Sequence, residues 1–180
     1  MGIDLKAGGR VRSKEKKVLN SPNLYLKLLM KLFRFMSRRS PCPIHKTILR
    51  RLMLSRVNRP ILSISRIAKY MKGKQDKFAI VISTVTNDER MIEVPKLNIV
   101  ALKFTKTAKD RILKAGGQCL TLEQFLMKNP TGKNTVLLRG PKTRQALKYF
   151  GRGAGLPHSK TRPRCRGKGN KYEKSTHVKA

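Results

Sequence analysis

The pattern of apolar and polar positions predicts regular structure most clearly in the middle of the chain. The largely β-branched run over 78–85 is typical of a strand that is covered on both faces. Apolar runs over 97–104 and 135–138 predict two more strands, and a brief strand is expected at 119–120. Because helical patterns separate these runs, the sequence predicts an α/β core.

Capping and turn residues mark where the helices of this middle part begin and end. Thr105 is a candidate N-cap, and the glycines at 116–117 end the helix that follows it. Thr121 caps a second, shorter helix, which the turn sequence at 129–132 ends. Residues 87–90 predict a turn directly after the first strand.

Upstream, the pattern predicts helices of a different kind. Ser21 is placed to cap a helix that has Pro22 at its first position and runs from Leu24 to about Arg39. At about 100° per residue, its cations share one narrow stripe: Lys27, Lys31, Arg34 and Arg38. Apolar side chains cover most of the remaining circumference, so we expect a largely buried helix. The stripe is either solvated or in contact with phosphates, and the near absence of acids favours phosphates.

Two further helices are expected before the first strand. One spans roughly 44–58 and ends at the Arg59-Pro60 step, because the residue before a proline disfavours helical geometry. The other is capped by Ser63 and closed by Gly73.

The charge of the chain is strongly one-sided. Among 180 residues, 43 are Lys or Arg and 9 are Asp or Glu, which gives a net charge of +34. Residues 75–138 hold only 10 of the cations but 6 of the acids, so almost all of the excess lies outside the middle. Solubility does not need such a charge, so it indicates a polyanionic partner, and nucleic acid is the leading candidate.

These patterns divide the chain into four parts. Residues 1–20 are predicted to form a basic N-terminal arm, 21–74 a basic helical region, 75–150 the α/β core, and 151–180 a basic, glycine-rich C-terminal extension. The two arms lack a sustained apolar period, so neither buries enough surface to order itself alone. We expect the arms to neutralise phosphates and to fold as they bind.

Residues with catalytic chemistry are scarce. Asp88, Glu89 and Glu93 cluster beside the predicted turn, which favours a charged loop over the metal-binding carboxylates of a nuclease. The glycines at 151–155 imitate a dinucleotide fingerprint, but their spacing is wrong and no helix follows. They fit either a flexible linker or a backbone that approaches RNA closely, with Arg152 supplying charge. We expect no catalysis, no small-molecule substrate and no cofactor.

The cysteine pattern and the short apolar stretches argue against a zinc protein, a disulfide-bonded secreted protein and a membrane-spanning protein. Cys42 and His45 form half of a zinc motif, but no second pair completes a tetrahedral set. The cysteines are odd in number and far apart, which favours a reducing compartment, and Cys119 is expected to be a buried apolar residue. The most apolar stretch, 24–36, contains three cations and is too short to span a membrane. We therefore expect an intracellular protein with no metal and no membrane partner.

Six motifs stand in order along the chain and carry a specific resemblance. They are YLKLLMKLFRF (25–35), SRVNRP (55–60), EVPKL (93–97), RILKAGG (111–117), TVLLRGP (135–141) and FGRGAGLPHS (150–159). Together they closely resemble the family of eukaryotic large-ribosomal-subunit proteins conventionally numbered eighteen, relatives of bacterial large-subunit protein fifteen. The resemblance covers nearly the whole chain.

This resemblance implies a structural constituent of the cytosolic large ribosomal subunit that binds and stabilises ribosomal RNA in translation. The implied partners are large-subunit ribosomal RNA and neighbouring large-subunit proteins, and not a second copy of the chain. The family also implies an irregular β-β-α superhelical core layer and assembly in the nucleolus. Only one proline follows Arg59, where many relatives have two.

Basic side chains of the arms and of the N-terminal helices are the candidate RNA contacts, with His158 as a residue that stacks on an unpaired base. The candidates are Arg10, Arg12, Lys14, Lys16, Lys17, Lys27, Lys31, Arg34, Arg38, Arg39, Arg50, Arg51, Arg56, Arg59, Lys142, Arg144, Arg152, His158, Lys160, Arg162, Arg164, Arg166, Lys168 and Lys171. Two alternatives remain: an architectural DNA-binding protein, which rarely has such an α/β middle, and an RNA-modifying enzyme, which the scarcity of acids disfavours.

Overall fold

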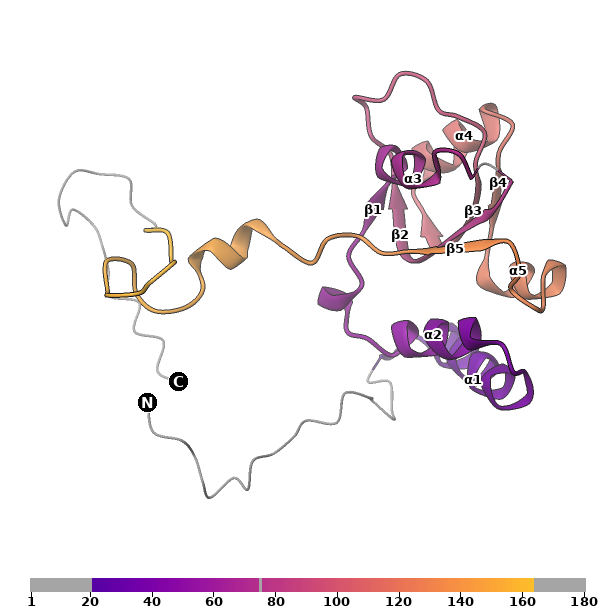
Figure 1. Cartoon of the computed structure of the whole chain (residues 1–180), viewed down its shortest axis with the longest axis horizontal. Coiled ribbons are helices and arrows are strands. Elements are labelled where there is room, and N and C mark those ends of the chain that lie inside the picture. The colour runs from indigo at the N-terminus through magenta and orange to yellow at the C-terminus, as the bar shows by residue number, and fades with distance from the viewer. Residues whose placement is uncertain (1–20, 75, 164–180) are drawn as a thin grey trace. The chain divides into compact units, whose positions relative to one another are not determined.

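The computed structural model describes residues 21–74 and 76–163. The chain divides into two compact units, Met1–Gly140 and Pro141–Ala180. The first unit contains a five-stranded sheet flanked by helices (Figure 1). The described part of the second unit contains a short 3₁₀ helix, η3 (Gln145–Tyr149), which the apolar pattern did not predict.

Strand β2 (Phe78–Thr86) is the centre of the sheet, and all the strand pairings are parallel. Strand β3 (Asn98–Phe104) runs along one edge of β2, and β4 (Gln118–Leu120) pairs with β3. On the other edge, β5 (Thr135–Leu138) pairs with the first half of β2 and β1 (Leu62–Ser63) with its end. The four predicted strands are confirmed. Strand β1 was missed, because two residues show no period.

Helices cover both faces of this sheet (Figure 1). They are α1 (Leu24–Arg39), α2 (Pro43–Leu52), α3 (Ile64–Met71), α4 (Lys106–Lys114) and α5 (Leu122–Lys128). Along β2, Val81 and Val85 join the core under α3 and α4, whereas Ile80 and Ile82 join the core under α1, α2 and α5. The unbroken apolar run of β2 is therefore explained by burial on both faces, and the α/β class is confirmed.

Helices α3, α4 and α5 begin at the predicted caps. Thr121 forms a capping box with Gln124: the Thr121 hydroxyl accepts the Gln124 N–H at 3.4 Å, and the Gln124 side chain accepts the Thr121 N–H at 3.1 Å. Thr105 and Ser63 precede α4 and α3 without a side-chain bond to the helix. Gly116 follows α4 at a φ of 72°, a conformation that glycine adopts without strain.

The predicted range of α1, from Leu24 to about Arg39, is confirmed, but its predicted cap and the predicted end of α2 are wrong. Helix α1 is capped by Asn23, whose side chain accepts the Leu26 N–H at 3.3 Å, so Pro22 lies before the helix rather than at its first position. The predicted cap, Ser21, instead accepts the N–H of Asn23 at 3.3 Å. Helix α2 ends at Leu52, well before residue 58.

The early end of α2 has a local cause. Ser55 is extended, with φ −64° and ψ 160°, and a separate 3₁₀ helix, η2 (Arg56–Asn58), follows it. The Asn58 side chain donates to the Ser55 hydroxyl at 3.1 Å, which stabilises this tighter turn.

Helix α1 is also much less buried than its apolar content predicts. Leu29, Met30 and Phe33 are buried, and Leu29 and Phe33 share a core cluster with residues of α2 and the sheet. The opposite side of the helix exposes large apolar side chains: Leu24, Tyr25, Leu28, Leu32 and Phe35. One side of α1 packs on α2, and no other described element covers its outer side, so the expectation of a largely buried helix is wrong.

Candidate nucleic-acid interface

The segment from 21 to 74 contains 14 Lys and Arg residues and no Asp or Glu. On α1, Lys27, Lys31 and Arg38 are exposed, and Arg34 is half-buried. The Arg39 guanidinium lies 5.8 Å from the centroid of the Phe35 ring, close enough for a cation–π contact. The outer side of α1 therefore combines a basic stripe with exposed apolar side chains.

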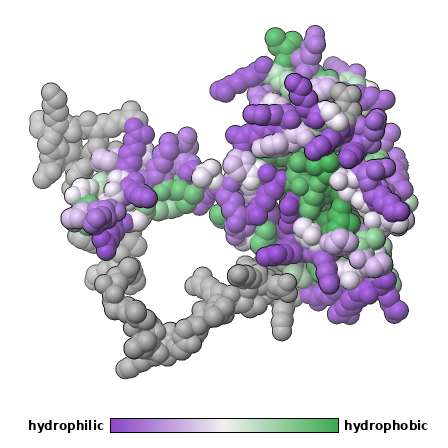
Figure 2. Space-filling view, viewed as in Figure 1, coloured by the Kyte–Doolittle hydropathy of each residue, from purple (hydrophilic) through white to green (hydrophobic). Residues whose placement is uncertain are grey.

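The same charge continues along α2 and η2. Arg50 and Arg56 are exposed, whereas Arg51 and Arg59 are half-buried. On the visible face of the first unit, hydrophilic residues dominate the surface, with apolar residues showing between them (Figure 2). This segment thus presents positive charge that no acid of the same segment neutralises.

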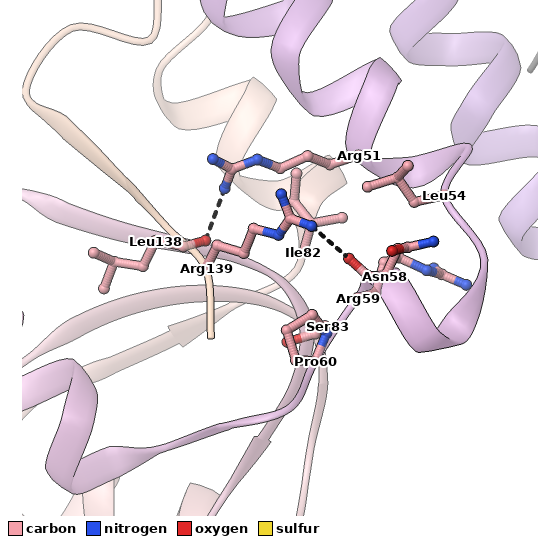
Figure 3. Close-up of a pocket in the computed structure, with 9 residues that line it drawn as sticks. All are labelled: Arg51, Leu54, Asn58, Arg59, Pro60, Ile82, Ser83, Leu138 and Arg139. Atoms are coloured by element: carbon pink, nitrogen blue, oxygen red, sulfur yellow. Dashed lines mark hydrogen bonds between the residues drawn. The ribbon is translucent and has the colours of Figure 1, made fainter. Parts of the chain in front are cut away.

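Two arginines from distant parts of the sequence meet in one hollow of the first unit (Figure 3). Arg51 comes from α2, and Arg139 directly follows β5. Nη1 of Arg51 donates to the Leu138 carbonyl at 2.8 Å, and Nη2 of Arg139 donates to the Asn58 carbonyl at 3.4 Å. Arg59 also lines the hollow, and its buried Nε has no hydrogen-bond partner among the described residues.

The surroundings of Arg51 and Arg59 disfavour the charged form of their guanidinium groups. Burial lowers the pKa of Arg51, and the positive charge of Arg139 lowers it further. Burial also lowers the pKa of Arg59. The other residues that line the hollow are neutral: Leu54, Asn58, Pro60, Ile82, Ser83 and Leu138. The hollow is therefore a site of uncompensated positive charge.

The second unit carries its cations around a loop that hydrogen bonds close. The Lys148 carbonyl accepts the N–H of Arg162 at 2.8 Å, and the Phe150 carbonyl accepts the Thr161 hydroxyl at 3.2 Å. Within the loop, the Ser159 hydroxyl donates to the carbonyl of Arg152 at 2.9 Å. The candidate residues of this unit that the structure describes are all exposed: Lys142, Arg144, Arg152, His158, Lys160 and Arg162.

Asp88 and Arg111 hold together the loop that follows β2. The Ser65 hydroxyl donates to the carboxylate of Asp88, and this bond is the main reason why the pKa of Asp88 is lowered. Arg111 donates to the side chain of Asn87 at 2.8 Å and to the carbonyls of Asp88 and Ile92, each at 2.9 Å. In the described ranges, no group of three His, Cys, Asp or Glu side chains is placed to hold a metal ion.

The histidine and the cysteines singled out in the sequence have structural surroundings. His45 is buried on α2, and its ring meets that of Phe33 at 6.3 Å and 62°. Burial lowers the pKa of His45, and the backbone of Pro130 opposes this more weakly. Cys42 is half-buried at the start of α2. Cys119 is also only half-buried, so its predicted burial is wrong, because β4 is an edge strand.

Comparison with known proteins settles the family. The family model described as ribosomal protein 60S L18 and 50S L18e matches residues 2–180. The chain is 50% identical to large ribosomal subunit protein eL18 of Cicer arietinum, over 96% of this chain and 94% of the relative. It is 48% identical to eL18 of Drosophila melanogaster, over 97% and 94%.

The chain belongs to the L18/L18e ribosomal protein family. It is therefore a structural component of the ribosome and not an enzyme. The resemblance read from the six sequence motifs is confirmed at the level of this family. No helix in the described part of the chain is long and apolar enough to cross a membrane.

The sequence-based candidates leave out one arginine of the hollow. Arg139 was not among the candidates, although it meets the candidate Arg51 in the hollow. A signal existed, because the residue after a parallel strand lies at the carboxyl edge of the sheet, where ligands commonly bind. The remaining candidates lie outside the described residues: Arg10, Arg12, Lys14, Lys16, Lys17, Arg164, Arg166, Lys168 and Lys171.

Proposed function

We propose that this protein is a structural constituent of the cytosolic large ribosomal subunit, which holds ribosomal RNA through a basic surface centred on the segment 21–74. The observation that carries the proposal is that this segment contains 14 Lys and Arg residues and no Asp or Glu. Several of these cations are exposed. Folded proteins usually intersperse both signs on their surface, so an acid-free stretch favours a polyanion as the partner.

The sheet and its helices would serve as the rigid part that fixes the position of these cations. The curated relatives are named as large-subunit proteins of plants and insects, which supports a cytosolic ribosome as the location. Backbone phosphates and RNA shape would supply most of the recognition, because contacts to phosphate carry no sequence information and the deep major groove of an RNA helix hides its base edges.

Several finer expectations belong to the same proposal. Residues 1–20 and 151–180 would act as basic arms on RNA, and neighbouring large-subunit proteins would contact the rest of the surface. The kinship with bacterial large-subunit protein fifteen, the superhelical description of the core and assembly in the nucleolus are carried by the resemblance alone.

Sedimentation of the tagged chain in cell extracts tests this function. We expect the protein to co-sediment with the large subunit and to leave that fraction when ribosomal RNA is digested. An architectural DNA-binding protein would instead follow chromatin and be released by DNase. Sedimentation with chromatin alone would overturn the proposal.

A matched pair of variants tests the surface. Replacement of the exposed Lys27 and Lys31 by Gln should weaken binding to large-subunit RNA. The slope of log affinity against log salt concentration should become shallower by roughly 0.7–0.9 per lost phosphate contact. Replacement of Lys103 and Lys106, which are also exposed but lie outside the segment, removes the same charge and serves as the control. Equal losses from both pairs would show that net charge alone, and not this surface, binds RNA.

A further inference from the structure

We propose that the guanidinium groups of Arg51 and Arg139, which line this small hollow, bind a single phosphate group of the RNA backbone. The proposal rests on the proposed function, because it names one contact of that RNA-binding surface. Figure 3 shows the Arg51 and Arg139 side chains approaching from opposite sides, with Ile82 next to them in this view. They come from α2 and from the residue after β5, so only the folded chain creates this site.

Two positive charges held close together repel each other, and a bound anion would offset this repulsion. Long arginine side chains on a surface normally turn away from each other, since repulsion is avoided at little cost. Here each guanidinium is instead tied to a backbone carbonyl, Arg51 to that of Leu138 and Arg139 to that of Asn58. No acid lines the hollow, so nothing in its wall balances the two charges.

The guanidinium donors that remain suit a phosphate. Each arginine has five N–H groups, and in the described part of the chain one donor of each is engaged by these carbonyls. The planar fork of the remaining donors matches two phosphate oxygens at once. Arg59 adds a third cation in the wall of the hollow, with its Nε buried and unpaired.

The floor of the hollow strengthens this attraction. Ile82 is almost fully buried, and Leu54, Pro60 and Leu138 add further apolar surface. Because apolar surroundings lower the local dielectric constant, a charge-assisted hydrogen bond made there is stronger than one on an open surface. A carboxylate of a neighbouring protein has similar charge. However, Arg50 and Arg56 belong to the same acid-free segment as Arg51 and Arg59 and are exposed, which favours the repeated negative charges of an RNA backbone.

The test compares two charge-matched variants of the full chain. Arg139→Gln removes one cation of the hollow. Arg66→Gln removes an exposed cation from α3, on the opposite face of the sheet, and is the control. We expect Arg139→Gln to weaken binding to large-subunit RNA roughly tenfold at low salt. The slope of log affinity against log salt concentration should become shallower by about the amount that one phosphate contact contributes. Arg66→Gln should leave both nearly unchanged.

Thermal unfolding with inorganic phosphate excludes a purely structural role. Without phosphate, Arg139→Gln should melt at the same temperature as the wild type or higher, because repulsion of Arg51 is removed. With added phosphate, the wild type and Arg66→Gln should gain more in Tm than Arg139→Gln. A melting temperature well below that of the wild type without phosphate would show that Arg139 only supports the fold, and would overturn the proposal.

The outcomes separate this site from the function as a whole. If the wild type failed to bind ribosomal RNA, the proposed function itself would fall. If it bound normally and Arg139→Gln matched Arg66→Gln in affinity, salt slope and phosphate response, only the phosphate site would fall. A third outcome is that the Arg139→Gln variant binds RNA normally but is missing from assembled subunits. That outcome would indicate that a carboxylate of a neighbouring protein contacts the hollow, and would also overturn the proposal.

Discussion

Strand β2 and helix α1 are both rich in apolar residues, yet the fold treats them differently. Five consecutive residues of β2, from Ala79 to Ser83, are buried. In α1, by contrast, the only buried residues are Leu29, Met30 and Phe33. The strand is covered because helices lie on both faces of the sheet, whereas α1 is an outer helix with one packed side. Apolar content therefore predicts burial only where the topology supplies a second layer.

The largest effect is expected where the two elements meet in one core. Phe33 of α1 and Ile80 of β2 are both fully buried in the cluster under α1, α2 and α5. Phe33→Ala should lower the free energy of unfolding by about 3–5 kcal/mol and Ile80→Ala by about 2–5 kcal/mol. Chemical denaturation of each variant measures this. A loss below about 1 kcal/mol for Phe33→Ala alone would mean that α1 is not part of the core.

A smaller loss is expected from crowding beside the sheet. A Cβ atom on Gly117 would lie 2.4 Å from the carbonyl oxygen of Leu97, which is backbone and cannot turn away. Gly117→Ala should therefore destabilise the first unit by about 1–3 kcal/mol. Gly153→Ala in the second unit is the control, because its nearest contact would be the Leu156 side chain at 3.7 Å. Thermal melts that fail to separate the two variants would contradict the crowding at Gly117.

The packing of α1 on α2 also predicts a pH dependence. His45 is buried beside Phe33, and its pKa is lowered, chiefly by burial, from about 6.5. The unfolded chain then binds more protons than the folded chain below pH 6.5, so stability is complete above that pH and falls as the solution is acidified toward the lowered pKa. Asp88, whose pKa is lowered from 3.8, acts only at lower pH. Unfolding free energies between pH 7 and 5 should decline for the wild type, and the decline should flatten in His45→Gln.

Much of the α/β core could be predicted because its signals are local. The capping box of Thr121 and Gln124, and the turn at Gly116, are encoded within a few residues. The exposure of α1 could not be predicted, since it depends on which elements pack against the helix. Likewise, charge identified the basic segment, but the meeting of Arg51 with Arg139 needs two distant elements to be placed in space.

The smallest effect is expected on the outer side of α1, and it decides whether the contrast with β2 holds. Leu28 is 52% exposed, whereas its neighbour Leu29 is 7% exposed. Leu29→Ala should cost about 2–5 kcal/mol of unfolding free energy, because the cavity lies in the core. Leu28→Ala removes the same atoms from a surface that is already in water, so its effect should stay within about 0.5 kcal/mol. The two substitutions share residue type, helix and helix propensity, so the difference between their denaturation midpoints reports burial alone. Equal losses would mean that the outer side of α1 is covered in the free protein, and that α1 resembles β2 after all.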